Sequence, residues 1–176
     1  MDEVQAAGPA AAGVVEAGVV DAVLTASRSL IAVATVSLGA AAEETSIAQY
    51  RALVVLASRG PQRLVDLAGA LGVAPSTAGR MCERLVRKGV IRRHRARKDR
   101  RAVLVSITPA GRQVVDQATR RRRALITQIM ARLSPAQQRG VTAALAAFAA
   151  AAGEVPDSQW PPVPVDEPYH EPGESS

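Results

Sequence analysis

The stretch DLAGALGVAPSTAGRMCERLVRKGVIRR, residues 66–93, decides the fold of this 176-residue chain. It predicts two short helices, Leu64–Leu71 and Pro75–Lys88, separated by the turn Gly72-Val73-Ala74. Proline suits the first position of a helix and glycine the position after its end, so Pro75 and Gly89 bracket the second helix. Two short helices joined in this way are typical of a helix-turn-helix.

A β-hairpin with a basic tip is predicted next. Val103, Val105 and Ile107 recur with the period of a strand, and Val90-Ile91 begins the opposing strand. Between them, residues 92–101 hold six arginines, Lys98, one histidine and one aspartate. The chain is therefore expected to be mainly α with a small β-hairpin, an α+β fold whose hairpin forms a wing.

Further helices are predicted on both sides of this unit. Val14–Ala42 carries a wide apolar stripe, which indicates burial under other helices or against a second subunit. Ser46–Ser58 begins with the spacing of a capping box. Thr108 and Pro109 open a helix that runs to about Leu133, and Ser134 and Pro135 open a final one with Leu145 and Phe148 on one face.

Charge is strongly segregated along the chain. The net charge is +6, yet residues 80–101 alone hold eleven of the 22 basic residues and only two acids. Residues 1–50 carry −5 and residues 154–176 carry −6, the latter with six prolines, which predicts a disordered acidic tail. So dense a basic run indicates an anionic partner rather than a solvated face.

Composition excludes several classes of protein. One cysteine and two distant histidines exclude a disulfide and argue against a metal site, and we expect no cofactor. Aromatic residues are too scarce for single-strand stacking, which favours duplex DNA. No catalytic motif is found, so an enzyme is not expected. The longest uncharged apolar run, residues 29–42, is too short to cross a bilayer, and the acidic start is unlike a signal peptide, so a cytoplasmic protein without membrane partners is expected.

The sequence resembles the MarR family of winged helix-turn-helix regulators. The resemblance rests on residues 46–61, 66–93, 99–112 and 133–137, and its most specific part is DRRAVLVSITPAGR, residues 99–112. Arg63 and Ala74 stand where members of the family usually place Ser or Thr caps. The resemblance implies a dimerisation helix (14–44), a winged DNA-binding domain (45–112) and C-terminal dimerisation helices (113–153). Composition adds a flexible arm (1–13), rich in Ala, Gly and Pro, and the acidic tail (154–176).

The second helix of the motif is the expected recognition helix. Helix N-termini in the major groove face base edges, so Ser76, Thr77 and Arg80 are expected to read bases beside Pro75. Arg84, Arg87 and Lys88 lie farther along and should hold phosphates. Ala78, Cys82, Leu85 and Val86 are expected to form the inward stripe, where the Cys82 thiol would be inert.

The wing is the second expected contact. The resemblance implies that a wing arginine enters the minor groove and that Asp99 orients Arg100 and Arg101. Phosphate contacts are assigned to the other basic residues of the hairpin, which are Arg92, Arg93, Arg95, Arg97 and Lys98. His94 is expected to be incidental rather than a sensor.

The leading hypothesis is a homodimeric, sequence-specific regulator, a repressor that binds a pseudo-palindromic operator in double-stranded DNA. The resemblance implies release by a small anionic or phenolic effector. The alternative is a non-specific architectural DNA-binding protein, which needs the same basic patch without a reading face.

Overall fold

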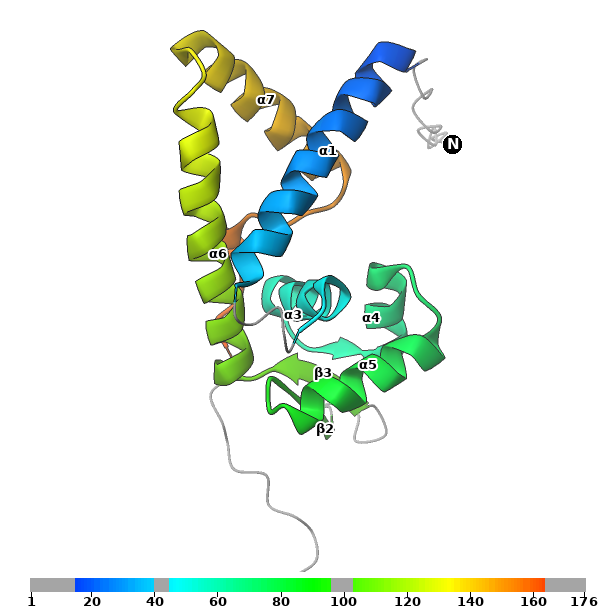
Figure 1. Ribbon diagram of the computed structural model, residues 1–176. Helices are drawn as coiled ribbons and strands as arrows, with labels where there is room; N and C mark the ends of the chain where they lie inside the picture. Colours follow the sequence, from blue (N-terminus) through cyan, green and yellow to red (C-terminus); the bar gives the residue numbers. More distant parts are fainter. Residues whose placement is uncertain (1–14, 40–44, 96–102, 164–176) are drawn as a thin grey trace, which may run out of the picture. The chain divides into compact units, whose positions relative to one another are not determined.

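The computed structural model describes residues 15–39, 45–95 and 103–163. The chain divides into two units, residues 1–32 and 33–176. The described part is mainly helical with one small antiparallel sheet (Figure 1). This confirms the predicted fold class.

Helix α1, Ala17–Leu38, forms within the long helix predicted from the apolar stripe. Large apolar side chains along it are exposed, including Val19, Leu24 and Ile31. Among the described residues it is the one helix long and apolar enough to cross a membrane. The uncharged run at residues 29–42 gave too short an estimate of this helix, because the helix begins earlier and includes the charged residues Asp21 and Arg28. The buried core helix of a soluble protein and a signal sequence near the N-terminus meet the same criterion, so it is weak evidence for a membrane span.

The second unit is built around three helices and a sheet. Helix α3 is Ile47–Arg59, α4 is Leu64–Leu71 and α5 is Pro75–Arg87. Strands β2, Ile91–Arg95, and β3, Val103–Ile107, form the expected hairpin. A third strand, β1, Gln62–Arg63, pairs with the other side of β3 and was not predicted.

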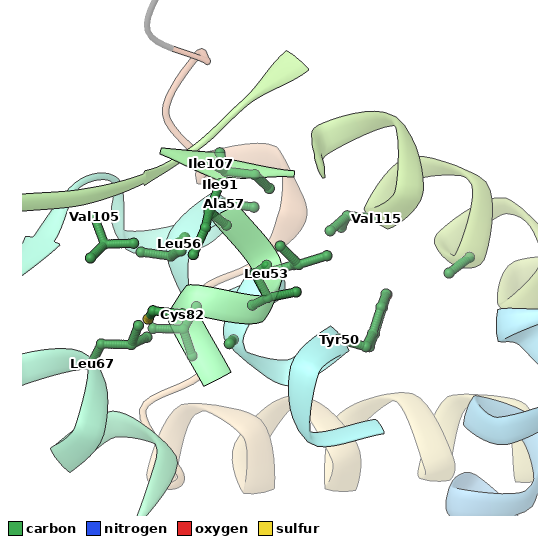
Figure 2. Packing of buried hydrophobic residues seen from close by; sticks show 14 of the residues in the cluster. Tyr50, Leu53, Leu56, Ala57, Leu67, Cys82, Ile91, Val105, Ile107 and Val115 are labelled. Atoms are coloured by element: carbon green, nitrogen blue, oxygen red, sulfur yellow. The ribbon is translucent and has the colours of Figure 1, made fainter. Parts of the chain in front are cut away.

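The core of this unit lies between the helices and the sheet (Figure 2). Leu53 and Leu56 of α3, Leu67 of α4, Leu85 of α5 and Ile91 of β2 are almost completely buried. Each buried side chain of this size contributes about 1.5–3 kcal/mol. These five residues fix the helix-turn-helix onto the sheet.

Helix α6, Pro109–Met130, starts at a junction formed by Thr108. The Thr108 hydroxyl accepts from the amide of Gly111 at 3.1 Å, which caps α6, and donates to the carbonyl of Gly89 at 2.7 Å. The Thr108 amide donates to Val90 at 3.1 Å. One residue therefore connects the segment between α5 and β2 to the start of α6. The predicted cap is confirmed.

Helix α7, Pro135–Ala151, begins with the predicted capping box at Ser134 and Gln137. None of its residues is buried, and Leu145 and Phe148 are 44% and 56% exposed. Its apolar face therefore has no cover within the described part of the chain.

The segment Glu154–Val163, which we call the C-terminal strap, differs from the predicted disordered tail. It contains a short 3-10 helix, Asp157–Gln159, and Trp160 packs against the core. The indole of Trp160 donates to Val155 at 2.9 Å, and the Arg112 guanidinium lies 5.3 Å from its ring centre. The composition of this segment, rich in proline and acids, predicted disorder. The contacts of Trp160 that order it are tertiary, and composition does not reveal them. Residues 164–176 lie outside the described part.

Candidate nucleic-acid interface

The turn between α4 and α5 orients α5, the expected recognition helix. Gly72 adopts the left-handed conformation, with φ of 65°, which ends α4 at the predicted position. The amide of Val73 then donates to Ala68 at 3.1 Å, and Pro75 opens α5. Arg63 and Ala74, the N-caps of α4 and α5, make no side-chain capping bond, as expected from the sequence. The geometry of α5 therefore depends on the turn and on packing.

Helix α5 is amphipathic. Ala78, Cys82 and Leu85 are buried, as predicted, but Val86 is 37% exposed, so its assignment to the inward stripe was wrong. Met81 takes its place and packs against the core. The spacing 78, 81, 82 and 85 follows one helical face, whereas position 86 turns away from it.

The outer face of α5 presents the predicted basic side chains. Pro75, Ser76, Arg80, Arg84, Arg87 and Lys88 are exposed, and Thr77 is half-buried. Arg80 donates to the Thr77 hydroxyl at 3.4 Å. Glu83 is the one acid of this helix. Hydroxyl and guanidinium groups at the N-terminal half and cations toward the C-terminal half form a surface suited to a polyanion.

The base of the wing is fixed by strand register. Ile91 pairs with Ile107 and Arg93 with Val105, so Arg93 and Arg95 share the strand face of the buried Ile91. Both arginines are exposed all the same. Arg92 is half-buried and donates from Nε to the Ser106 hydroxyl at 3.3 Å. Arg92 therefore has a partner inside the sheet. The wing residues Arg97, Lys98, Asp99, Arg100 and Arg101 lie outside the described residues.

His94 and Cys82 have environments that suit structural residues. Burial, and secondarily Arg92, lower the pKa of His94, which keeps the imidazole neutral at pH 7. Its Nδ1 lies 3.4 Å from the Ser106 hydroxyl. Burial raises the pKa of the Cys82 thiol, so it stays protonated and unreactive.

A hollow beside α5 was missed by the sequence analysis. It measures about 190 Å³, and its lining includes Ser46 and Gln49 of α3 together with Arg80 and Arg84 of α5. The Ser46 hydroxyl accepts from the Gln49 amide at 3.2 Å, in the predicted capping box. The capping signal located the start of α3, but it did not reveal that this end lies beside α5.

Comparisons with known proteins agree with this architecture. The model of the MarR family matches residues 45–103. The crystal structure of RV1404 from Mycobacterium tuberculosis is 41% identical, covers 81% of this chain and 99% of its own, and superposes with a TM-score of 0.75. The chain belongs to the MarR family.

Two more distant structures show the same MarR-type fold. The transcriptional regulator Tm0710 from Thermotoga maritima is 23% identical over 78% of this chain and 96% of its own, with a TM-score of 0.64. FabT from Streptococcus pneumoniae, solved in complex with DNA, is 21% identical over 78% of this chain and 98% of its own, with a TM-score of 0.62. Comparison with curated proteins finds no match.

Membership in the MarR family makes this protein a DNA-binding transcriptional regulator with a winged helix. The family and its structural neighbours are regulators rather than enzymes.

Proposed function

We propose that this MarR-family protein is a homodimeric repressor. It binds a pseudo-palindromic site in double-stranded DNA and leaves that site when a small-molecule effector binds. The observation that carries the proposal is the outer face of α5, where hydroxyls and cations are exposed on a helix held rigidly by the core.

Within this proposal α5 lies in the major groove. Ser76, Thr77 and Arg80 read base edges, and the guanidinium of Arg80 is suited to the two acceptors of guanine. Its bond to Thr77 supports this role because it holds the guanidinium near the N-terminus of the helix. Arg84, Arg87 and Lys88 hold phosphates and set the position of the helix.

The wing supplies the second contact. Arg93 and Arg95 hold phosphates beside the helix, which the exposure of both side chains on β2 supports. Arg92 helps to hold the base of the wing in position, because its Nε donates a hydrogen bond to the Ser106 hydroxyl of β3. The assignments of Arg97, Lys98, Arg100 and Arg101, oriented by Asp99, rest on the family resemblance.

The partner of the apolar helices is a second copy of the chain. Exposed apolar side chains recur along α1 and on α7, and such faces are stable in water only when they are covered. A two-fold dimer would present two copies of α5 to successive major grooves about one helical turn apart. Release by an effector would then be a shift between two dimer geometries. A protein with this function acts in the cytoplasm.

The decisive experiment is a footprint. Genomic fragments captured by the full chain are sequenced, and the fragment bound best is digested with a nuclease in the presence of the protein. Protection of a discrete site of about 20 bp with two-fold symmetry supports the proposal, since two half-sites one turn apart span that length. Uniform protection of all fragments would support the architectural alternative instead.

A further inference from the structure

Five exposed cations gather on α5 and β2, in the second unit. Arg84, Arg87 and Lys88 lie along the last turns of α5, and Arg93 and Arg95 follow on β2. Helix α5 packs on strand β2, so the five side chains extend from neighbouring elements. We call these five residues the basic face.

The positive charge of the basic face is not neutralised by the described chain. Within residues 15–39, 45–95 and 103–163, no carboxylate forms an ion pair with any of these five cations. Glu83 is the one acid of α5, and β2 has none. Like charges so close together repel one another, so a flexible polyanion that lies among them would be favoured.

The C-terminal strap brings the end of the described chain to the same sheet. Residues 161–163 line a small hollow together with residues of α3 and with Ser106 of β3. Pro161 lies so close to Gly60 that a Cβ there would be 3.8 Å from its Cγ. Ser106 is the register partner of Arg92, and adjacent strands are about 4.8 Å apart, so the chain leaves the strap about one strand away from β2.

The residues that follow the strap, 164–176, carry the opposite charge. They lie outside the described part, and their sequence contains no lysine or arginine and four acids, which are Asp166, Glu167, Glu171 and Glu174. An extended chain spans up to about 3.3 Å per residue, so a segment of this length can reach about 43 Å. That is roughly twice the length of α5, which is about 20 Å for 13 residues. The segment is therefore long enough to pass the edge of the sheet at β2 and to reach the basic face.

We propose that the acidic segment 164–176 docks on the basic face and competes with DNA for the same cations. The inference rests on the proposed function because it concerns the regulation of that DNA-binding surface. The carboxylates accept charge-assisted hydrogen bonds from the guanidinium and ammonium groups, as DNA phosphates would. Each exposed ion pair is weak, but the strap tethers the segment beside the face at an effective concentration on the order of millimolar.

Docking is measured first without DNA. Ser175→Cys carries a nitroxide spin label, because the native Cys82 is buried and burial raises the pKa of its thiol. In the nitrogen-15-labelled full chain at low salt, the amides of β2 and of the last turn of α5 should be broadened more strongly than those of α7. Raising the salt to about 0.5 M should remove this selective broadening because the ion pairs are screened. Broadening that is absent, or equal on all three elements, would overturn docking.

Competition is measured next, by titration of DNA with three proteins. They are the full chain, a chain truncated after Val163, and a full-length chain whose four acids are neutralised by Asp166→Asn, Glu167→Gln, Glu171→Gln and Glu174→Gln. At about 50 mM salt the last two should bind DNA about tenfold more tightly, as expected if the segment is docked about 90% of the time. Their salt slopes of log K should also be steeper, because cations already paired with the segment release no counterions. If the neutralised chain binds DNA like the full chain, charge pairing is not the cause and the proposal fails.

Two double variants control for net charge. Glu171→Gln with Glu174→Gln removes two negative charges from the segment, and Glu16→Gln with Asp21→Asn removes two from exposed residues of the first unit. Only the first pair should raise the affinity for DNA, and equal gains would assign the effect to net charge and overturn docking. The footprint is measured separately: a discrete footprint without selective broadening sinks this inference alone, and selective broadening without a footprint sinks the DNA proposal alone.

Discussion

Gly111 packs directly against the backbone of Val90, where α6 begins beside the hairpin. A Cβ at residue 111 would overlap the carbonyl oxygen of Val90 and lie 2.8 Å from Cγ1 of Ile107. Neither neighbour can move freely, because Val90 accepts the Thr108 amide and Ile107 is buried in the sheet. This contact sets how closely the start of α6 approaches the hairpin.

Gly111→Ala should therefore lower the free energy of unfolding by about 1–3 kcal/mol, the usual cost of overpacking. Urea denaturation measures the change. Gly140→Ala on α7 is the matched control, since nothing lies within 4 Å of its added Cβ. That variant should be neutral or stabilised by roughly 0.5–1 kcal/mol. Equal losses in both variants would contradict the close approach.

Arg80→Ala and Arg87→Ala should separate sequence reading from phosphate binding. Loss of a base contact at Arg80 should cost about 1–3 kcal/mol on the operator and less on random DNA. Loss of Arg87 should weaken both DNAs alike and reduce the salt slope of log K by about 0.9. Titrations of both DNAs over a range of salt concentrations check this. If Arg80→Ala weakens both DNAs equally, Arg80 does not read bases.

If the proposed dimer forms through α7, Phe148→Glu should convert it into monomers without unfolding the chain. Phe148 is 56% exposed, so a charge there costs the isolated chain little but would be buried in a dimer. Sedimentation velocity at micromolar concentration measures the state, and circular dichroism checks the fold. Ala147→Glu, at another exposed position of α7, tests whether the effect depends on the site. An unchanged dimer in Phe148→Glu would remove α7 from the interface.

Docking of the strap should depend on pH through Glu154. The hydrogen bond from Arg51 lowers the pKa of this carboxyl below its usual value, and the charge of Arg59 adds to the effect. A lowered pKa means that the charged form stabilises docking at and above the ordinary glutamate range. This stabilisation is lost as the pH falls through the lowered value.

Trp160 emission during acid titration follows this change. The wild-type chain should show a transition below the ordinary glutamate range, and Glu154→Gln should lack it. An identical transition in both proteins would assign it to another group.

Cys82 should be inert in the folded protein. Burial keeps the thiol protonated, so a disulfide reagent should modify it only as fast as the chain unfolds. Reaction rates in increasing urea measure this. Peroxide should leave operator affinity unchanged, and rapid modification of the native protein would contradict the buried position.

The helix-turn-helix was predictable from sequence because its signals are local. Gly72, Pro75 and the caps at Ser46 and Thr108 act within a few residues of their own position, and all four are confirmed. The alternation of Val103, Val105 and Ile107 likewise follows from the strand period.

The features that sequence missed depend on contacts between distant residues. Strand β1 is two residues long and exists because Gln62 and Arg63 meet β3. The strap is ordered because Trp160 reaches Arg112 and Glu154 reaches Arg51. The sequence did not distinguish Arg92 from the other basic residues of the wing. Its hydrogen bond to Ser106 depends on the strand register, which places the two residues opposite each other.

The junction at Thr108 has a mechanical consequence. The Thr108 side chain bonds both to Gly89, just after α5, and to the first turn of α6. A rotation of α6 about its axis would therefore move the end of α5 with it. The motion of the long helix α6 would thus be transmitted to α5. In the dimer proposed above, such a rotation would change the spacing between the two copies of α5 without unfolding any element.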